Sequence, residues 1–447
     1  MLKRIFCVFL IICLLFTPVL TVSAYETTGI EITAKAALLV SLDTDTNEFL
    51  YEKNIHERVY PASITKIMTT ILILESDKYD PDAKIAMTQE ALDRISGTGS
   101  SVSWLAAGEE ITQLDLVYTI LMSSYGDCSL LAAMYYGGSV ENFVAQMNAK
   151  ASELGLTNTS YENPIGLHHE NNYTTAYDTY ILTKYALQNE TFKTVCESDR
   201  YTFETNSGKR VLTTTNSLQD KNTNYYYSPA KGVKTGYTDE AGRCLVSTAC
   251  NTSGYNYMCI VFGCPPNEKR HFTESTELYN WAFKTFELKT VADTSNPVAG
   301  VNVELSNDTD YVSLYVEKGI TSILPKDAND STVKIVPNLP NTTVDAPIKK
   351  GQILGTADII YAENKIGTVN LIANENIEKS TTLSAIRVIK TFFTSKYMKF
   401  VYVLIALLIV AFILAIIVMN SNSKNRKKRK IKYVPYKESE NKKRDNY

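Results

Sequence analysis

The pattern of apolar and polar residues predicts most of the elements of this chain. Two apolar runs, 36–42 and 47–52, are joined by four polar residues and predict a β-hairpin. Apolar residues at helical spacing predict helices over 63–75, 113–136, 141–154, 177–188 and 272–286. Strand-like runs return at 244–250 and 257–263. Strands at both ends of a helical region predict an α+β fold whose antiparallel sheet joins the two ends.

The pattern of apolar and polar residues changes between about 295 and 385. Short β-rich runs are broken there by Asn, Asp, Gly and Pro, and no long helical pattern occurs. We expect a small all-β domain over 295–385 that spaces the preceding domain, 25–290, from the apolar segment near the C-terminus, or docks partners. It carries no obvious chemistry.

Two segments are not typical of globular sequence. Lys3 and Arg4 precede an apolar run from 5 to 20, and small residues follow at 22–24, so residues 1–24 are expected to be a signal peptide. The segment 400–419 contains no charged residue. At ~1.5 Å rise per residue a helix of this length crosses ~30 Å of hydrocarbon. We expect it to be a transmembrane helix.

Charge sets the expected topology. The segment 420–447 holds 11 Lys and Arg against 3 Asp and Glu, and positive charge marks the cytoplasmic side. The residues from 25 to about 398 are then extracellular and the basic tail cytoplasmic, in a single-pass protein of the cell membrane. The chain has a net charge of −3, the tail +8 and the signal +2, which leaves −13 between them. An ectodomain this acidic argues against nucleic acid as a partner.

Cysteine and histidine give little sign of metal chemistry. There is no CxxC, no HExxH and no comparable ligand spacing, so no metal site is expected. Six cysteines remain after the signal, and strand-like surroundings favour small buried hydrophobic residues over disulfides, although pairing stays open. They are Cys128, Cys196, Cys244, Cys250, Cys259 and Cys264.

The first candidate chemical element is Ser63-Ile64-Thr65-Lys66 at the start of a predicted helix. Residues three apart share one helix face, so the hydroxyl and the amine can meet. A lysine whose pKa is lowered by burial can act as the base that a serine nucleophile needs. The spacing alone is weak evidence, because Ser331 and Lys334 match it too.

Two further elements follow along the chain. Lys234-Thr235-Gly236, followed by Tyr237, precedes a strand-like run, and its amine and hydroxyl suit a ligand that bears a carboxylate. Ser124-Tyr125-Gly126-Asp127 lies between two helical stretches and is the least specific of the three. Their order along the chain is more specific than any one of them.

Together the three elements resemble the active-site set of penicillin-binding proteins and serine β-lactamases. The stretches AALLVSLDTDTNEFLYEKN, RVYPASITKIMTT and KGVKTGYTDEAGRCLVSTA narrow the resemblance. They are similar to the low-molecular-weight penicillin-binding proteins, which are serine-type D-alanyl-D-alanine carboxypeptidases of the peptidase S11 kind. The resemblance covers nearly all of 30–390. It implies a β-lactamase/transpeptidase-like catalytic domain, a small all-β domain and a C-terminal membrane anchor.

The resemblance also implies a mechanism. Ser63 attacks the bond between the last two D-alanines of peptidoglycan pentapeptide stems, Lys66 takes its proton and Ser124 helps relay it. Backbone N–H groups of Ser63 and Tyr237 form the oxyanion hole, and the Lys234-Thr235-Gly236 strand holds the terminal carboxylate. β-Lactams act as acylating inhibitors, and no cofactor is implied.

One residue departs from the family pattern, which has asparagine where this chain has Gly126. That asparagine contacts the substrate amide and the active-site lysine, and here water could fill its space. Loss of such a group costs roughly 1–3 kcal/mol. A penicillin- or peptidoglycan-binding paralogue with weakened turnover therefore stays open, as does, less favoured, a β-lactamase. The sequence does not indicate a role in growth, division or sporulation.

Overall fold

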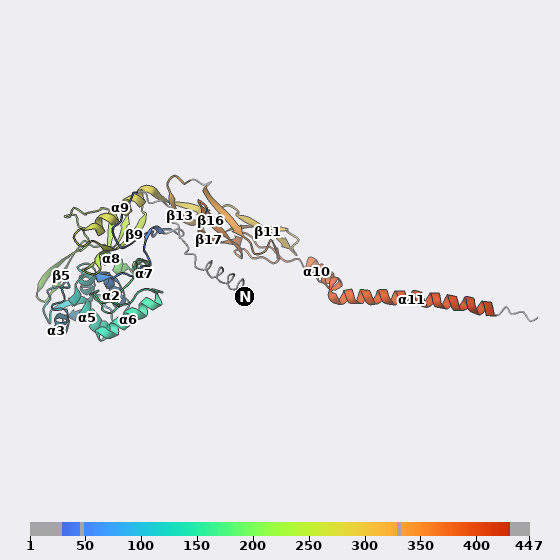
Figure 1. Ribbon diagram of the computed structural model, residues 1–447, viewed down its shortest axis with the longest axis horizontal. Coiled ribbons are helices and arrows are strands. Elements are labelled where there is room, and N and C mark those ends of the chain that lie inside the picture. The colour runs from blue at the N-terminus through green and yellow to red at the C-terminus, as the bar shows by residue number, and fades with distance from the viewer. Residues whose placement is uncertain (1–28, 45–48, 329–331, 430–447) are drawn as a thin grey trace, which may run out of the picture. The chain divides into compact units, whose positions relative to one another are not determined.

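The computed structural model describes residues 29–44, 49–328 and 332–429 of the chain (Figure 1). The expected signal peptide and the end of the basic tail lie outside these residues. Contacts divide the chain into two compact units. The first holds the residues up to Val298 with Val316–Asn338 and Gly355–Leu371, and the second holds Ala299–Tyr315, Leu339–Leu354 and the residues from Ile372 onward.

A five-stranded antiparallel sheet forms the centre of the first unit. Its strands lie in the order β2-β1-β9-β8-β7, so the early hairpin β1–β2 joins the three late strands through the pairing of β1 with β9 (Figure 1). This arrangement confirms the prediction of a sheet that joins the two ends of the α+β domain. The strands are β1 (Ala36–Ser41), β2 (Phe49–Lys53), β7 (Ala230–Thr238), β8 (Gly242–Cys250) and β9 (Asn256–Cys264).

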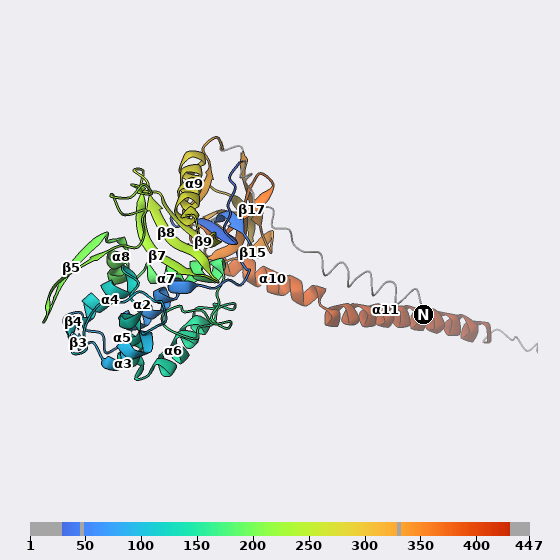
Figure 2. The same ribbon diagram turned by 60° about the vertical axis from the view of Figure 1, so that its left-hand side comes forward.

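Alternate residues of the sheet pack against two separate layers of helices, as expected for a strand buried on both faces. Leu38 and Ile260 point into a core shared with α2 to α8, whereas Leu39 and Val261 point into a core shared with α9. Figure 2 shows α9 on the opposite side of the sheet from α2, α7 and α8. The helices are α2 (Lys66–Leu74), α3 (Gln89–Ile95), α4 (Gln113–Leu121), α5 (Gly126–Gly137), α6 (Val140–Glu153), α7 (Ala176–Ala186), α8 (Glu190–Glu197) and α9 (Arg270–Thr285).

The helical pattern over 113–136 divides into α4 and α5. Thr112 and Asp115 form a capping box at the start of α4, with each side chain accepting a hydrogen bond from the backbone N–H of the other residue. The helix ends at Leu121, and α5 begins only at Gly126. The break places Ser124 between two rigid helices.

Two small ribbons were not predicted. One pairs β3 (Lys84–Ala86) with β4 (Glu110–Thr112), and the other pairs β5 (Arg200–Thr205) with β6 (Gly208–Thr213). Each has at most one or two buried side chains, so the alternation that identifies a strand is weak.

The β-rich region contains strands β10 (Phe286–Ala292), β11 (Ala299–Glu304), β12 (Tyr311–Val316), β13 (Ile320–Pro325), β14 (Val333–Asn338), β15 (Thr343–Asp345), β16 (Ile353–Tyr361) and β17 (Asn364–Ala373). In the first unit β10 pairs with β13 and β14 pairs with β16, both antiparallel. In the second unit β11 pairs antiparallel with β12 and parallel with β15. The predicted β structure is confirmed.

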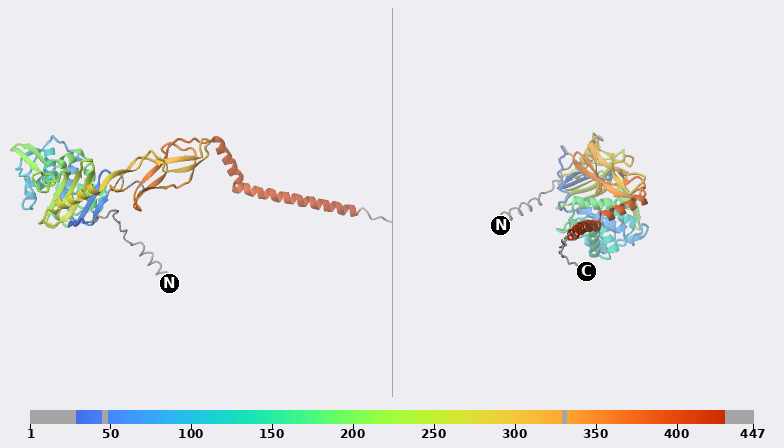
Figure 3. Two further views of the ribbon diagram at one scale, coloured as in Figure 1. Left: turned by 90° about the horizontal axis from the view of Figure 1, so that it is seen from above. Right: turned by 90° about the vertical axis from the view of Figure 1, so that its right-hand side faces the viewer.

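Two helices end the described chain, and they meet at a bend at Ser395 (Figure 3). The first, α10 (Thr381–Thr394), was not predicted. The second, α11 (Lys396–Arg429), contains the one helix of the described residues that is long and apolar enough to cross a membrane, Lys396–Ser421. Its apolar part agrees with the span expected over 400–419.

The six cysteines are all unpaired in the part of the chain described here. Cys250 is half-buried and the other five are buried. Five of the six therefore agree with the prediction of small buried residues, and Cys250 does not.

Candidate active site

Ser63 lies on a single 3-10 turn, Ala62–Thr65, directly before α2. Pro61 precedes the turn, and Ala62 has a positive φ of 45°, an uncommon conformation for a residue with a side chain. Ser63 is therefore on a tight turn and not on the α-helix that the spacing predicted. The turn still directs it toward the first residue of α2, Lys66.

The amine of Lys66 joins two separate parts of the site. Its Nζ donates hydrogen bonds to Ser63 Oγ, at 2.9 Å, and to the carbonyl oxygen of Ile165, at 2.6 Å. The predicted pair of hydroxyl and amine is confirmed as a direct contact. A proton can pass between two atoms at this separation without an intervening water.

Burial makes Lys66 a possible base. The side chain is fully buried, and this burial lowers the pKa of Lys66 to about 7, although the negative charge of Asp127 acts in the opposite direction. A substantial fraction of the amine is therefore neutral near pH 7. The neutral amine can accept the proton of Ser63.

Ser124 lies in the break between α4 and α5 and lines the same cleft as Ser63. Its φ of 65° is in the left-handed region, which costs of order 1–3 kcal/mol for a residue with a side chain. The backbone is held by a hydrogen bond from the N–H of Tyr125 to the carbonyl of Thr119, at 3.1 Å. The strained residue is thus fixed by its neighbours at the edge of the cleft.

Lys234, Thr235 and Gly236 lie on β7, at the edge of the main sheet. Lys234 is buried and donates to the carbonyl of Thr235, at 3.0 Å, while the Thr235 hydroxyl bonds that of Thr215, at 2.7 Å. Burial lowers the pKa of Lys234 well below its usual range, and the nearby charge of Lys66 lowers it further. The two lysines therefore lie within electrostatic range of each other.

Gly236 lets β7 run directly against the turn that carries Ser63. A Cβ at this position would lie 3.1 Å from both the Pro61 carbonyl oxygen and the Ser63 nitrogen. Contacts this tight require the neighbouring backbone to move. The glycine thus brings the backbone of β7 beside that of Ser63, and Tyr237 follows it with its ring half-exposed.

These elements enclose a cleft of about 850 Å³. Ser63, Ser124, Thr235, Gly236 and Tyr237 all line it. Lys66 and Lys234 lie buried behind them. The structure therefore brings together all seven residues that the sequence singled out.

The sequence analysis missed two cationic residues and one histidine that also line this cleft. They are Arg243, Lys269 and His271, and the Arg243 guanidinium lies 5.0 Å from the ring centre of Tyr237. Burial, followed by the charges of Arg243 and Lys269, lowers the pKa of His271 to about 3, so this imidazole is neutral near pH 7. A predicted hairpin of β7 and β8 in the correct register would have identified Arg243, because this register pairs Arg243 with Tyr237.

Two family models match consecutive parts of the chain. Residues 21–265 match the family model described as D-alanyl-D-alanine carboxypeptidase, and residues 286–379 match the C-terminal domain of penicillin-binding protein 5. The D-alanyl-D-alanine carboxypeptidase DacF of Bacillus subtilis is 34% identical over 78% of this chain and 86% of its own length. DacC of Escherichia coli, with the same description, is 30% identical over 82% of this chain and 89% of its own.

A solved structure is similar over the same extent. Penicillin-binding protein 5 of Haemophilus influenzae superposes with a TM-score of 0.66 at 27% identity. The match covers 79% of this chain and all of the other. The similarity therefore extends over both the α+β part and the β-rich part of the chain.

Proposed function

The chain belongs to the D-alanyl-D-alanine carboxypeptidase family, peptidase S11, and on this premise we propose that it removes the terminal D-alanine from peptidoglycan stem peptides. The observation that carries the proposal is the contact of 2.9 Å between Ser63 Oγ and a buried lysine whose pKa is about 7. A serine with such a base is equipped for acyl transfer.

The reaction begins with Lys66 in its neutral form. Lys66 accepts the Ser63 proton while Ser63 Oγ attacks the carbonyl carbon between the two D-alanines. The tetrahedral intermediate then collapses, D-alanine leaves with a proton on its amine, and the shortened stem stays as an ester on Ser63. Water hydrolyses this ester and restores the serine. Ser124, at the edge of the cleft, is proposed to relay the proton to the leaving amine.

Charge that develops on the substrate has partners on both sides of Ser63. The N–H groups of Ser63 and Tyr237 are the proposed oxyanion hole, and the close approach of Gly236 to the Ser63 nitrogen supports this pairing. Lys234 and Thr235 are proposed to bind the terminal carboxylate. Arg243 and Lys269 add positive charge to the same cleft, which favours an anionic substrate although the chain as a whole is acidic.

The same site explains the expected sensitivity to penicillin. A β-lactam presents a reactive carbonyl and a carboxylate, so it can acylate Ser63 while Lys234 and Thr235 bind its carboxylate. The ester that results blocks the serine for as long as water is slow to hydrolyse it.

Membrane attachment is proposed through α11. Its segment Lys396–Ser421 is long and apolar enough to cross a bilayer, and Lys and Arg dominate the sequence after it. We propose a single-pass topology with the catalytic unit outside the cell, where peptidoglycan lies, and the tail in the cytoplasm.

The test uses the full chain in detergent beside Ser63→Ala. We expect the wild type to release D-alanine from a stem peptide ending in D-Ala-D-Ala and to form a stable adduct with labelled penicillin. Ser63→Ala should do neither while keeping the same melting temperature. An adduct without D-alanine release would instead favour the weakened paralogue, and fast loss of the adduct would favour a β-lactamase.

A further inference from the structure

The space beside Gly126 is already occupied. An ideal Cβ on this buried residue would overlap the hydroxyl of Ser100, and it would lie 2.8 Å from Cδ1 of Ile95 and 3.1 Å from Cγ2 of Ile165. Cβ atoms essentially never come within 3.0 Å of such neighbours. A side chain from an earlier segment therefore stands where the side chain of residue 126 would begin. Protein atoms therefore lie where the Cβ of the missing asparagine would be.

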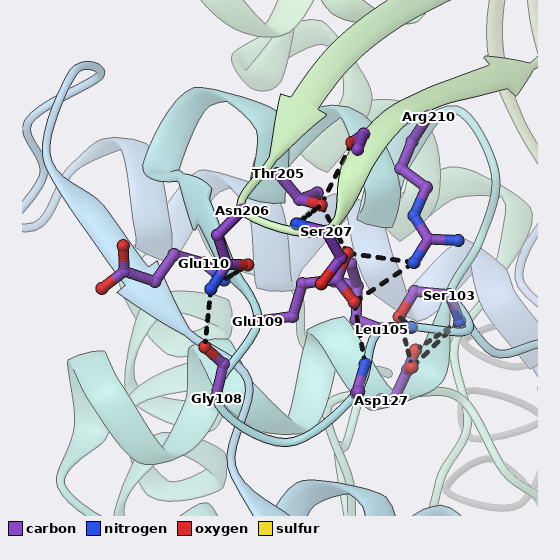
Figure 4. A network of polar contacts seen from close by, with 12 residues as sticks. Ser103, Leu105, Gly108, Glu109, Glu110, Asp127, Thr205, Asn206, Ser207 and Arg210 are labelled. Atoms are coloured by element: carbon purple, nitrogen blue, oxygen red, sulfur yellow. Dashed lines mark hydrogen bonds and ion pairs between the residues drawn. The ribbon is translucent and has the colours of Figure 1, made fainter.

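The segment that carries Ser100 is fixed against the start of α5 by hydrogen bonds. The N–H of Gly126 donates to the carbonyl of Ser101, at 2.8 Å. The backbone N–H and the hydroxyl of Ser103 donate to the carboxylate of Asp127, the hydroxyl at 2.6 Å (Figure 4). On the other side, the Ser100 N–H donates to the Thr98 hydroxyl, at 3.3 Å. Ser100 is thus held from both sides.

Ser100 also lies close to the reacting groups. It lines the same cleft as Ser63 and Ser124. The Cβ position that it blocks at Gly126 is in contact distance of Ile165, the residue whose carbonyl accepts a hydrogen bond from Lys66. Ser100 is half-buried, and its hydroxyl bonds to no other residue in the described part of the chain. A hydroxyl can donate one hydrogen bond and accept two, so this group is available to a ligand.

We propose that Ser100 is a substrate-binding residue, and that its hydroxyl, seated over Gly126, bonds a peptide group of the stem bound beside Ser63. The role rests on the proposed function. It makes Gly126 and Ser100 a coupled pair, because the glycine leaves room for the hydroxyl and the hydroxyl supplies the polar contact that a glycine cannot make.

The first test compares Ser100→Ala with Ser101→Ala in the full chain. Ser101 is an exposed neighbour in the same segment, and alanine keeps the backbone carbonyl to which Gly126 bonds. We expect Ser100→Ala to lower kcat/KM for D-alanine release by about tenfold, the usual cost of one lost hydrogen bond, mainly through KM. Ser101→Ala should stay within about twofold of the wild type.

A second pair of variants tests the coupling. Gly126→Ala should displace the Ser100 hydroxyl, lower kcat/KM by a similar factor and lower the melting temperature. Adding Ser100→Ala to Gly126→Ala removes the overlapping oxygen but leaves the contact with Ile95, so the double variant should regain part of the melting temperature and lose no further activity. Contacts that are independent would give additive losses instead.

Three outcomes would overturn the proposal. They are a Ser100→Ala variant within twofold of the wild type, an equal loss in Ser101→Ala, and additive losses in the double variant. If the wild type releases no D-alanine, the proposed function has failed on its own. The rate of Ser63 acylation by labelled penicillin, whose side chain also presents an amide, then serves as the readout for Ser100 with the same expected ratios.

Discussion

Two regions of the first unit bury ionisable side chains, and they treat them in opposite ways. In the cleft, Lys66 has two hydrogen-bond acceptors among the described residues and Lys234 has one, and the pKa of each is lowered. Beside the β5–β6 ribbon, the buried carboxylate of Glu109 accepts hydrogen bonds from several donors at once. The buried amines of the cleft therefore have few hydrogen-bond partners, whereas the buried carboxylate beside the ribbon has many. We call the second region the saturated region.

The saturated region is shown in Figure 4. The Arg210 guanidinium donates to both oxygens of Glu109, at 3.0 and 3.2 Å, and the Ala106 N–H and the Thr205 hydroxyl also donate to it. These bonds fasten the ribbon to the segment that leads into β4. A buried charge with enough partners stabilises a fold, whereas a buried amine with few partners gives up its proton easily. The comparison thus distinguishes a buried ionisable group that stabilises the fold from one that is suited to proton transfer.

The largest expected effect comes from Lys66→Met, which keeps the length of the side chain and removes the amine. Acylation of Ser63 by labelled penicillin should fall by roughly 10²–10⁴-fold, because the serine loses its base. The free energy of unfolding should change less than in Glu109→Gln, since the desolvation cost of the buried amine disappears and offsets the two hydrogen bonds that Ser63 and Ile165 lose. Lys84→Met, at an exposed lysine, serves as the control. Acylation at the wild-type rate would contradict the assignment of the base.

The opposite pattern is expected for Glu109→Gln. The amide keeps one acceptor but turns its NH₂ toward existing donors, so unfolding should become easier by about 1–3 kcal/mol in denaturant titration. Acylation of Ser63 should be unchanged at temperatures where the variant is folded. Glu110→Gln, next along the chain and partly exposed, should stay within about 0.5 kcal/mol of the wild type. Equal destabilisation by the two variants would remove the contrast between the regions.

The smallest effect concerns Asp127, whose carboxylate accepts a hydrogen bond from Ser103 and raises the pKa of Lys66. In the wild type the neutral form of Lys66 predominates above pH 7, so acylation should rise with pH, reach half its maximum near pH 7 and fall about tenfold per unit below it. Asp127→Asn removes a negative charge that favours the protonated amine. The half-maximum should therefore move to lower pH, whereas Glu109→Gln should leave it in place. A shift to higher pH would be incompatible with this account.

The sequence predicted the parts of the site that depend on local spacing. Ser63 and Lys66 are three residues apart, so their meeting needs only one turn of chain. The two faces of the main sheet also follow from alternation along single strands. The chain pattern predicted the β-rich region as well, because its strands are short and bounded by turn residues.

Other features depend on contacts between distant segments. Ser100 lies at the site because Ser103 and Asp127 hold its segment against α5, and the sequence around Ser100 carries no sign of this. The place of Arg243 in the cleft could be predicted only from the register in which β7 and β8 pair. The helix α10 was not predicted. None of its residues is buried in the part of the chain that the structure describes, so no buried face accounts for its apolar residues.

The unpaired cysteines have a consequence for redox chemistry. Burial raises the pKa of Cys244 and Cys259 to about 12 and that of Cys128 further, so these thiols hardly form the thiolate that oxidants and alkylating agents attack. The described fold contains no disulfide. It should keep the same stability in reducing and oxidising surroundings, and a cysteine engineered onto its surface would have only the half-buried Cys250 as a competitor for thiol-reactive dyes.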